Sequence, residues 1–414
     1  MKAKILPPPA LGLVQQALAI DPIFELLQQY RADKRSDKQD FGIGVYKDHL
    51  NRATVFKSVK AAEQWRIDTE QDKAYSGPLG NQQFCQLLSQ LILGQALNKQ
   101  LADNLVLAQT PGGVGALRLA FDMVKHSPRS QNLWLSNNTW QVHHPIAIAS
   151  GLNRQQYAYC DGQNRLCFEA LLHSLNAAQC GDAVLIQASC HNPTGLDLNR
   201  QQWRRLSELC LRKQLLPIID MAYHGLGEGL NADALGVRRL AADLPEFILC
   251  YTCSKNFGLY SDRAGMLMVK TRSKKARSSL SQQLMQLATC YYFTPPAHGA
   301  SLVKYILSRD LLRRQWQQEL NVICDRLQGL RQQLFQALVR AAPQRDWRFL
   351  TNGSGMFGLF PLNPQEIQQL RQRYGIYMVA NGRVNLSGFN PTNISTVTRA
   401  IADIANASRP CLSC

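Results

Sequence analysis

A single lysine, Lys255, lies among hydroxyl and small residues in the stretch YTCSKNFGLYSDR, residues 251–263. The apolar run FILC precedes this stretch, so the pattern places Lys255 where a strand ends and a loop begins, a frequent place for chemistry in α/β proteins. Taken alone, an isolated lysine is more often a solvated surface residue. A chemical role for Lys255 therefore depends on the rest of the chain.

Two further features lie at expected strand ends. AQTPGGVGALRLA, residues 108–120, joins a strand to a helix through glycines, and free N–H groups at such a helix start can bind a phosphate. This stretch matches neither the Walker pattern nor G-x-G-x-x-G, and such glycine turns are common. Asp220 closes the apolar run LLPIID and is followed by Tyr223. It is either a helix cap or a charge that meets a cationic partner.

Two polar residues complete the set. Asn192 precedes a proline in SCHNPTG and offers a fixed carboxamide, although the same pattern is typical of a plain Asn-Pro turn. Arg383 begins an expected strand in ANGRVNLSG, and a guanidinium can bind a carboxylate through two hydrogen bonds. Considered singly, such an arginine is more often a surface residue.

The order of the elements predicts an α/β protein with two domains. From about residue 100 to 270, short β-rich runs alternate with helical patterns, which is typical of a mainly parallel sheet flanked by helices. The expected strands are NLVLAQ, NLWLS, AVLIQAS, LLPIID, FILCYT and AGMLMV. An amphipathic pattern from Ser308 to about Ala341 predicts a long helix between the domains, and a smaller α+β unit follows it.

Composition bounds the class of protein. The chain has 414 residues, of which 45% are hydrophobic and 18% charged, as in a globular protein with a large core. No apolar window is long enough for a membrane span, and Pro7, Pro8 and Pro9 interrupt the only stretch that begins like a signal peptide. The twelve scattered cysteines then indicate reduced thiols and a cytoplasmic protein.

Two compositional features suggest other partners. The terminal CLSC has a metal-ligand spacing but only two ligands, so we expect no metal. The net charge of +17 can attract nucleic acid, but its densest run, KTRSKKARSS at residues 270–279, lacks aromatic residues for stacking on bases. We expect a solvated face and no nucleic-acid partner.

Together the motifs resemble a known family. CHNPTG, IIDMAY, SKNFGLYSDR, PPAHGA, GMF and GRVN occur in the order and spacing of class I aminotransferases, in the aspartate and aromatic subgroup of fold type I pyridoxal-phosphate enzymes. The likeness runs from about Asp21 to about Ala405. It implies transamination between an L-amino acid and a 2-oxo acid, a homodimer with shared active sites, a large cofactor-binding domain at 53–310, and a small domain formed by 1–52 and 311–414.

The resemblance implies the catalytic roles residue by residue. Lys255 matches the lysine that binds pyridoxal phosphate covalently and moves the proton between the substrate α-carbon and C4′ of the cofactor. An amine can do both because it is a carbonyl nucleophile and a base. Asp220, supported by His143, would pair with the pyridinium nitrogen and keep it protonated. Tyr223 and Asn192 would hydrogen-bond the 3-oxygen of the ring.

Other contacts with the cofactor follow from the same resemblance. Trp140 in SNNTWQVHH would stack on the ring, although core packing is its simpler interpretation. The phosphate would be bound by the backbone of Gly113 and Val114, the hydroxyls of Thr252 and Ser254, and Arg263.

The resemblance also implies how the substrate and the second subunit contribute. Tyr75 in KAYSGPLG matches a tyrosine that reaches the phosphate of the neighbouring subunit's cofactor. Arg383 would hold the substrate α-carboxylate, with Gly44 and Phe357 lining the pocket.

The sequence departs from the family at two positions. Val114 replaces a usual threonine, a loss of one hydrogen bond on the order of 1 kcal/mol, so cofactor binding should survive. Thr289 in LATCYYFTPPAHGA stands where the family has the arginine that pairs, from the partner subunit, with the distal carboxylate of aspartate or glutamate. An unpaired buried carboxylate is costly. Tyr291, Tyr292 and Phe293 follow, and they are either pocket-lining or core residues.

These departures leave several functions open. Thr289 favours aromatic or other uncharged amino acids as substrates. The main alternative is an aspartate aminotransferase with a relocated cation, for example from the basic run around Lys274 and Arg277. A pyridoxal-phosphate lyase and a non-enzymatic nucleic-acid-binding module are further alternatives, and the intact Lys255, Asp220 and Arg383 argue against the second of these.

Overall fold

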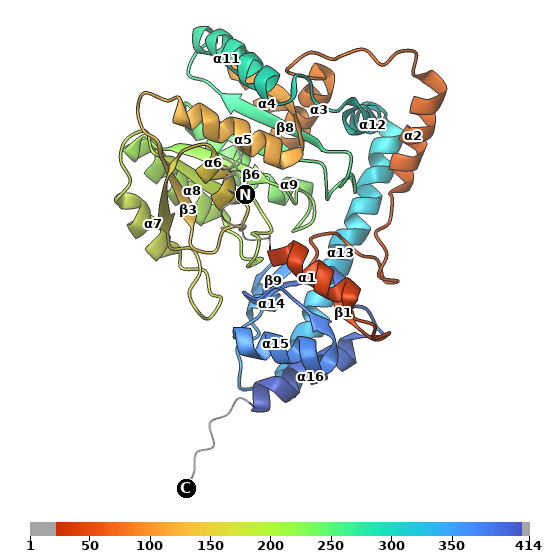
Figure 1. Ribbon diagram of the computed structural model, residues 1–414. Helices are drawn as coiled ribbons and strands as arrows, with labels where there is room; N and C mark the ends of the chain where they lie inside the picture. Colours follow the sequence, from red (N-terminus) through yellow and green to blue (C-terminus); the bar gives the residue numbers. More distant parts are fainter. Residues whose placement is uncertain (1–21, 408–414) are drawn as a thin grey trace, which may run out of the picture.

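The structure, a computed structural model, describes residues 22–407 and consists of a large α/β unit and a smaller α+β unit (Figure 1). The large unit contains a seven-stranded sheet in the order β2-β8-β7-β6-β5-β3-β4. Its strands are β2 (Leu105–Pro111), β3 (Asn132–Ser136), β4 (Asn153–Tyr157), β5 (Ala183–Gln187), β6 (Leu216–Met221), β7 (Phe247–Thr252) and β8 (Ala264–Lys270). Strands β4, β3, β5, β6 and β7 are parallel, whereas β8 is antiparallel to both of its neighbours.

The predicted fold class, a mainly parallel sheet flanked by helices, is confirmed. The six strands expected from apolar runs all form, because strands covered on both faces need apolar side chains throughout; every residue of β5, β7 and β8 is buried. The seventh strand, β4, was not predicted. Its residues NRQQY are polar because it is an edge strand whose first four residues are exposed.

Helices cover both faces of this sheet and connect its strands (Figure 1). The helices that precede the first strand of the sheet along the chain are α2 (Lys57–Thr69), α3 (Gln82–Leu93) and α4 (Gln95–Leu101), with a 3-10 turn, η1 (Ala102–Asn104). The helices between its strands are α5 (Gly112–Lys125), α6 (His143–Ala149), α7 (Phe168–Asn176), α8 (Arg200–Lys213), α9 (Leu230–Asp233) and α10 (Leu235–Asp243). Two more, α11 (Lys274–Tyr292) and α12 (Ala297–Ser308), follow the last strand.

The predicted long helix is α13 (Asp310–Ala341), and it joins the two units (Figure 1). Its first half places Trp316, Leu320 and Ile323 in the core of the large unit. Its second half places Leu334 and Leu338 in the core of the small unit. The helix is therefore packed at both ends, and it fixes how the two units face each other.

The small unit is built from both ends of the described chain. It contains α1 (Pro22–Ala32), β1 (Gln39–Asp40), α14 (Phe349–Asn352), β9 (Phe357–Leu359), α15 (Pro364–Tyr374), β10 (Ile376–Tyr377), β11 (Arg383–Asn385), η2 (Leu386–Gly388) and α16 (Ile394–Ala407). Strand β1 pairs with β10, and Phe41 packs into the same core as the C-terminal elements. On this packing we propose the division into residues 1–52, 53–310 and 311–414, with the first and last segments forming one domain.

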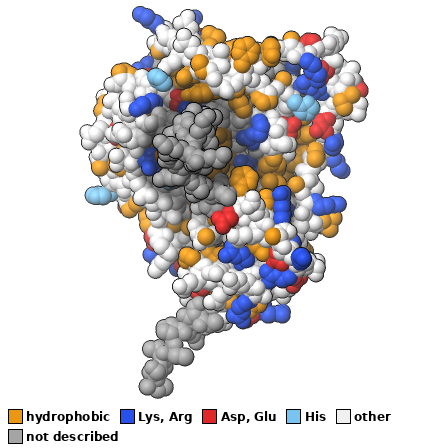
Figure 2. Space-filling view, in the orientation of Figure 1, with side chains coloured by type: hydrophobic (Ala, Val, Ile, Leu, Met, Phe, Trp, Pro, Cys, Tyr) orange, Lys and Arg blue, Asp and Glu red, His pale blue; other side chains and the backbone are white. Residues whose placement is uncertain are grey.

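The surface shows no concentration of positive charge on the face seen in Figure 2, where the Lys and Arg side chains of the described residues are spread over both units. Within residues 22–407, no helix is both long and apolar enough to cross a membrane. The same part of the chain holds no cluster of three metal-ligating side chains. The N-terminal prolines and the cysteines of CLSC lie outside the described residues.

Candidate active site

The residues singled out in the sequence gather at the carboxyl ends of the central strands, where the small unit faces the large one. Asp220 lies on β6, Lys255 follows β7, and Asn192 lies in the loop after β5. Arg383 is the first residue of β11 and comes from the small unit. Parallel strands present their carboxyl ends at one edge of a sheet, so residues far apart in the chain meet there.

Asp220 is a buried carboxylate and not a helix cap. His143, at the start of α6, is fully buried, and its Nε2 lies 3.2 Å from Oδ2 of Asp220. The other ring nitrogen of His143 lies 2.6 Å from the hydroxyl of Thr139. The edge of the half-buried Trp140 ring meets this imidazole, with centroids 5.3 Å apart. The histidine thus fixes the position of the Asp220 carboxylate.

The Lys255 amine lies 5.0 Å from the centroid of the Tyr223 ring. The pKa of Lys255 is lowered to about 8, mainly by burial; Asp220 acts in the opposite direction, and Arg263 and Arg383 contribute to the lowering. Desolvation and nearby cations both disfavour the protonated amine. Lys255 therefore has the electrostatic character of a nucleophile and base near neutral pH, and it is not a solvated surface residue.

A short chain of polar contacts connects the two units across the site. The carboxamide nitrogen of Asn192 lies 3.4 Å from the hydroxyl of Tyr223, and its oxygen lies 3.5 Å from Nη1 of Arg383. Burial raises the pKa of the Tyr223 hydroxyl, so it remains a hydrogen-bond donor. The Asn192 loop is held by Gln187, which exchanges two hydrogen bonds with the Asn192 backbone.

Arg383 is buried and its guanidinium is oriented by the small unit. Its Nη2 donates to the carbonyl of Gly42 at 2.6 Å, and the group lies 4.7 Å from the centroid of the Phe357 ring. A Cβ on Gly44 would lie 3.5 Å from Cζ of Phe357, so Gly44 and Phe357 are neighbours at this point. The three residues expected around a substrate carboxylate are thus brought together.

The turn between β2 and α5 forms an anion cradle. Gly112 has φ +69°, and a Cβ at this position would collide with Nη2 of Arg263. Thr252 and Ser254 share a hydrogen bond of 2.9 Å, and Nη1 of Arg263 lies 3.4 Å from the Ser254 hydroxyl. Two hydroxyls, a guanidinium and the N-terminus of a 14-residue helix are a donor set for a dianionic phosphate.

Two of the expected site residues are not part of this constellation within one chain. Tyr75 is 80% exposed, and its ring makes a T-shaped contact with that of Phe293, with centroids 5.3 Å apart. Thr289 is exposed on α11, and its hydroxyl donates to the carbonyl of Met285. The structure places both at the end of α11.

Three residues that position the site were not predicted from the sequence. Thr139 fixes His143, Gln187 fixes the Asn192 loop, and the Gly42 carbonyl orients Arg383. Gln187 had a sequence signal, because it is the one polar residue of the buried strand AVLIQ and stands at its carboxyl end. For Gly42 the signal was weak: the glycines of FGIGVYKD, residues 41–48, are compatible with backbone that passes close to another group, but they more often mark an ordinary turn.

This geometry defines a class of protein: an α/β enzyme with a lysine of lowered pKa at the carboxyl edge of a sheet and a set of anion-binding donors beside it. The chain belongs to the class I and II aminotransferases, whose family model matches residues 36–401. It is 41% identical to an aromatic-amino-acid aminotransferase of Pseudomonas aeruginosa over 93% of this chain and 96% of that protein. It is 40% identical to an aspartate aminotransferase of Escherichia coli over 94% and 98% of the two chains.

Solved structures agree with the sequence relatives. The chain superimposes on an aromatic-amino-acid aminotransferase from Burkholderia pseudomallei, covalently bound to pyridoxal phosphate, with a TM-score of 0.91 and 32% identity over 96% of this chain and 99% of that chain. The protein is therefore a pyridoxal-phosphate-dependent transaminase of fold type I. The cradle fits this cofactor, because the start of α5, the hydroxyls of Thr252 and Ser254 and the Arg263 guanidinium are donors for a phosphate. Only a glycine at position 112 leaves room for that guanidinium.

Proposed function

We propose that this transaminase takes the amino group from an aromatic or other uncharged L-amino acid and transfers it to a 2-oxo acid. The observation that carries the proposal is Thr289, which supplies a hydroxyl where the resemblance expects the arginine for a distal carboxylate. Its hydroxyl is already engaged by Met285. The relative named as an aromatic-amino-acid aminotransferase supports the same preference.

For the catalytic residues we propose the following roles. When bound, pyridoxal phosphate supplies an aldehyde carbon that takes up the amino group and a ring that accepts electrons from the substrate α-carbon. Lys255 holds the cofactor and, once released, its neutral amine takes the proton from the α-carbon. Asp220, fixed by His143, faces the ring nitrogen, and Tyr223 and Asn192 donate hydrogen bonds to the ring oxygen.

The remaining contacts are proposed on the same basis. The phosphate is held by the residues of the cradle, namely Gly113, Val114, Thr252, Ser254 and Arg263, and Trp140 stacks on the ring. Arg383 binds the substrate α-carboxylate beside Phe357 and Gly44. The burial of Arg383 and its contact with Asn192 support this role, because a buried guanidinium is poorly solvated and binds a carboxylate strongly.

We also propose a homodimer in which each copy completes the other's site. Apolar side chains are exposed on α5, along α11 and just after it, and at Tyr75: Val114, Met285, Tyr291, Phe293 and Tyr75. The ring of Tyr291 packs under Arg118 of α5, with 4.9 Å from Cζ to the centroid, so α5 and the end of α11 form one surface. A second copy related by a twofold axis would cover this surface.

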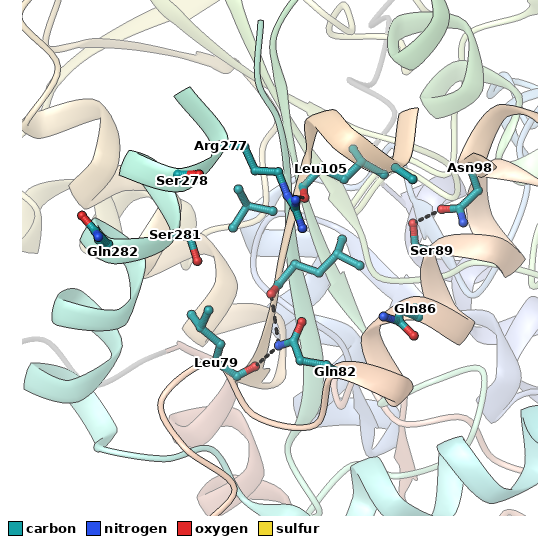
Figure 3. Close-up of a pocket in the computed structure, with 13 residues that line it drawn as sticks. Leu79, Gln82, Gln86, Ser89, Asn98, Leu105, Arg277, Ser278, Ser281 and Gln282 are labelled. Carbon is teal, nitrogen blue, oxygen red and sulfur yellow. Dashed lines mark hydrogen bonds between the residues drawn. The ribbon is translucent and has the colours of Figure 1, made fainter. Parts of the chain in front are cut away.

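The main alternative, an aspartate aminotransferase with a relocated cation, is not supported by the position of the basic run. Arg277 lies twelve residues before Thr289 on α11, about 18 Å along a helix that rises 1.5 Å per residue. Its Nε donates to the carbonyl of Leu105 at 2.9 Å, inside a polar pocket between α3, β2 and α11 (Figure 3). Gln82 donates to another carbonyl of the same edge strand, that of Leu107. Arg277 is thus bound to the edge strand of the sheet.

For the compartment we propose the cytoplasm, since all ten cysteines within residues 22–407 are free thiols. The amino acceptor is proposed only as a 2-oxo acid. An acceptor with a distal carboxylate would meet the same Thr289.

The test is a half-reaction titration of the purified holoenzyme with Phe, Tyr, Trp, Ala, Asp and Glu. The absorbance of the lysine-bound cofactor is followed as it converts to that of pyridoxamine phosphate. Conversion by aromatic or neutral amino acids, at concentrations where Asp and Glu give none, is expected. Efficient conversion by Asp and Glu would refute the proposed specificity, and formation of pyruvate or CO₂ without pyridoxamine phosphate would indicate a lyase instead.

A further inference from the structure

The chain leaves α11 through an uncommon turn centred on Phe293. Phe293 has φ +61° and ψ −62°, and the N–H of Thr294 donates to the carbonyl of Tyr292 at 2.6 Å. This is the γ-turn with positive φ, the rarer and more strained of the two forms. A non-glycine residue held in such a conformation is a sign of a functional constraint.

The three aromatic residues at the end of α11 have different surroundings. Tyr292 packs against the core on one face of the sheet, and burial raises the pKa of its hydroxyl. Tyr291 donates its hydroxyl to Asp122 on α5. Phe293, by contrast, is 55% exposed, and among the aromatic contacts of the described residues its ring makes only a T-shaped contact with the still more exposed Tyr75. The strained turn therefore presents Phe293 outward and fixes its direction.

Phe293 lies beside Thr289 and Tyr75, the two residues that the family resemblance assigns to the second subunit's site. Its N–H donates to the carbonyl of Thr289 at 3.2 Å and to that of Ala288 at 3.1 Å, so it stands one helical turn from Thr289. Its ring lies against Tyr75. Any surface that receives Thr289 and Tyr75 must therefore also receive the Phe293 ring.

We infer that Phe293 is a specificity-determining residue that acts across the dimer, where its ring forms an apolar wall against the side chain of the bound amino acid. This inference rests on the proposed function. An aromatic ring supplies a large contact area, and a ring already fixed by its backbone loses little conformational freedom on binding. The absence of a cation at position 289 and the outward ring of Phe293 then favour the same substrates, namely aromatic or large apolar amino acids.

The first experiment compares kcat/KM for Phe with kcat/KM for Ala in three variants of the holoenzyme. Phe293→Gly removes the ring and also suits the positive φ, so it should fold, whereas Phe293→Tyr keeps the ring. The matched control is Leu311→Ala, an exposed apolar residue on α13. We expect the Phe to Ala ratio to fall about tenfold or more in Phe293→Gly, as for a lost apolar contact in a pocket, and to be kept in the other two variants.

A hybrid dimer tests from which subunit the ring comes. Lys255→Ala chains and Phe293→Gly chains are co-expressed with two different affinity tags, and the hybrid dimer, which has one intact lysine, is separated from both homodimers by purification on both tags. The chain that holds this lysine carries the Phe293→Gly substitution, so the only Phe293 ring in the hybrid comes from the other chain. A wild-type Phe to Ala ratio in this hybrid is expected. A low ratio, or an unchanged ratio in the Phe293→Gly homodimer, would overturn the inference. If the wild-type enzyme converts no neutral amino acid, the proposed function fails instead.

Discussion

The lowered pKa of Lys255 leads to a prediction that can be tested before any substrate is known. An ordinary lysine has a pKa of 10.5, whereas burial lowers that of Lys255 to about 8. At pH 7 this makes about one amine in ten neutral, against about one in three thousand at the ordinary value. In the cofactor-free protein the neutral, acylatable fraction of Lys255 at pH 7 should therefore be roughly 300 times that of an ordinary lysine.

The assay is competitive acylation of the cofactor-free protein at a series of pH values, with peptide mass spectrometry of the labelled lysines. Lys73, whose side chain is 79% exposed, serves as the internal reference. The labelling of Lys255 should rise with a midpoint near pH 8.

Charge variants separate the causes of the shift. Asp220→Asn should lower the midpoint, because Asp220 favours the protonated amine, and Arg263→Met should raise it, because Arg263 disfavours that form. A midpoint near 10.5, or shifts of the opposite sign, would refute the electrostatic account of the site.

Three further predictions follow from individual contacts. The pKa of Lys255 is lower in the folded protein than in the unfolded chain, so the burial of its charged amine destabilises the fold below about pH 8, and this cost disappears toward pH 10.5. The cofactor-free Lys255→Met variant should therefore be more stable than wild type near neutral pH. In denaturant titrations this gain should shrink between about pH 8 and pH 10.5. Gly112→Ala should weaken pyridoxal phosphate binding at least about tenfold but leave phosphate-free pyridoxal unaffected, because the added Cβ meets Arg263; equal losses for both in binding titrations would contradict the cradle. Thr139→Val should lower kcat about fivefold by the loss of one hydrogen bond to His143, and Thr139→Ser should restore it; an unimpaired valine variant would show that Thr139 does not orient the histidine.

The sequence by itself determined much of the chemistry. The sequence predicted the strand that ends with Asp220, the strand before Lys255 and the glycine turn before α5. Buried parallel strands are continuous apolar runs, so the polar and glycine residues at their ends are easy to identify. The order and spacing of the motifs indicated the family. The position of the missing arginine, Thr289, was also readable, since it depends only on the count of residues before Pro295.

What the sequence could not determine was the environment of these residues. The low pKa of Lys255 arises from burial and from Arg263 and Arg383, and Arg383 lies 128 residues further along the chain. Asp220 could be read as a cap until the fold placed His143 behind it. Contacts of this kind depend on which strands are neighbours, and the amino-acid pattern of one segment carries no information about the segment that packs against it.

The end of α11 shows most clearly what the sequence determines and what only the tertiary structure decides. The sequence contains three consecutive aromatic residues, Tyr291, Tyr292 and Phe293, and it does not indicate which of them lies in the core and which lines a pocket. Only the tertiary structure separates them: the helix turns one toward Asp122 and one into the core, and the γ-turn directs the third outward. Side-chain direction is set by backbone dihedrals and packing neighbours, and these exist only once the chain has folded.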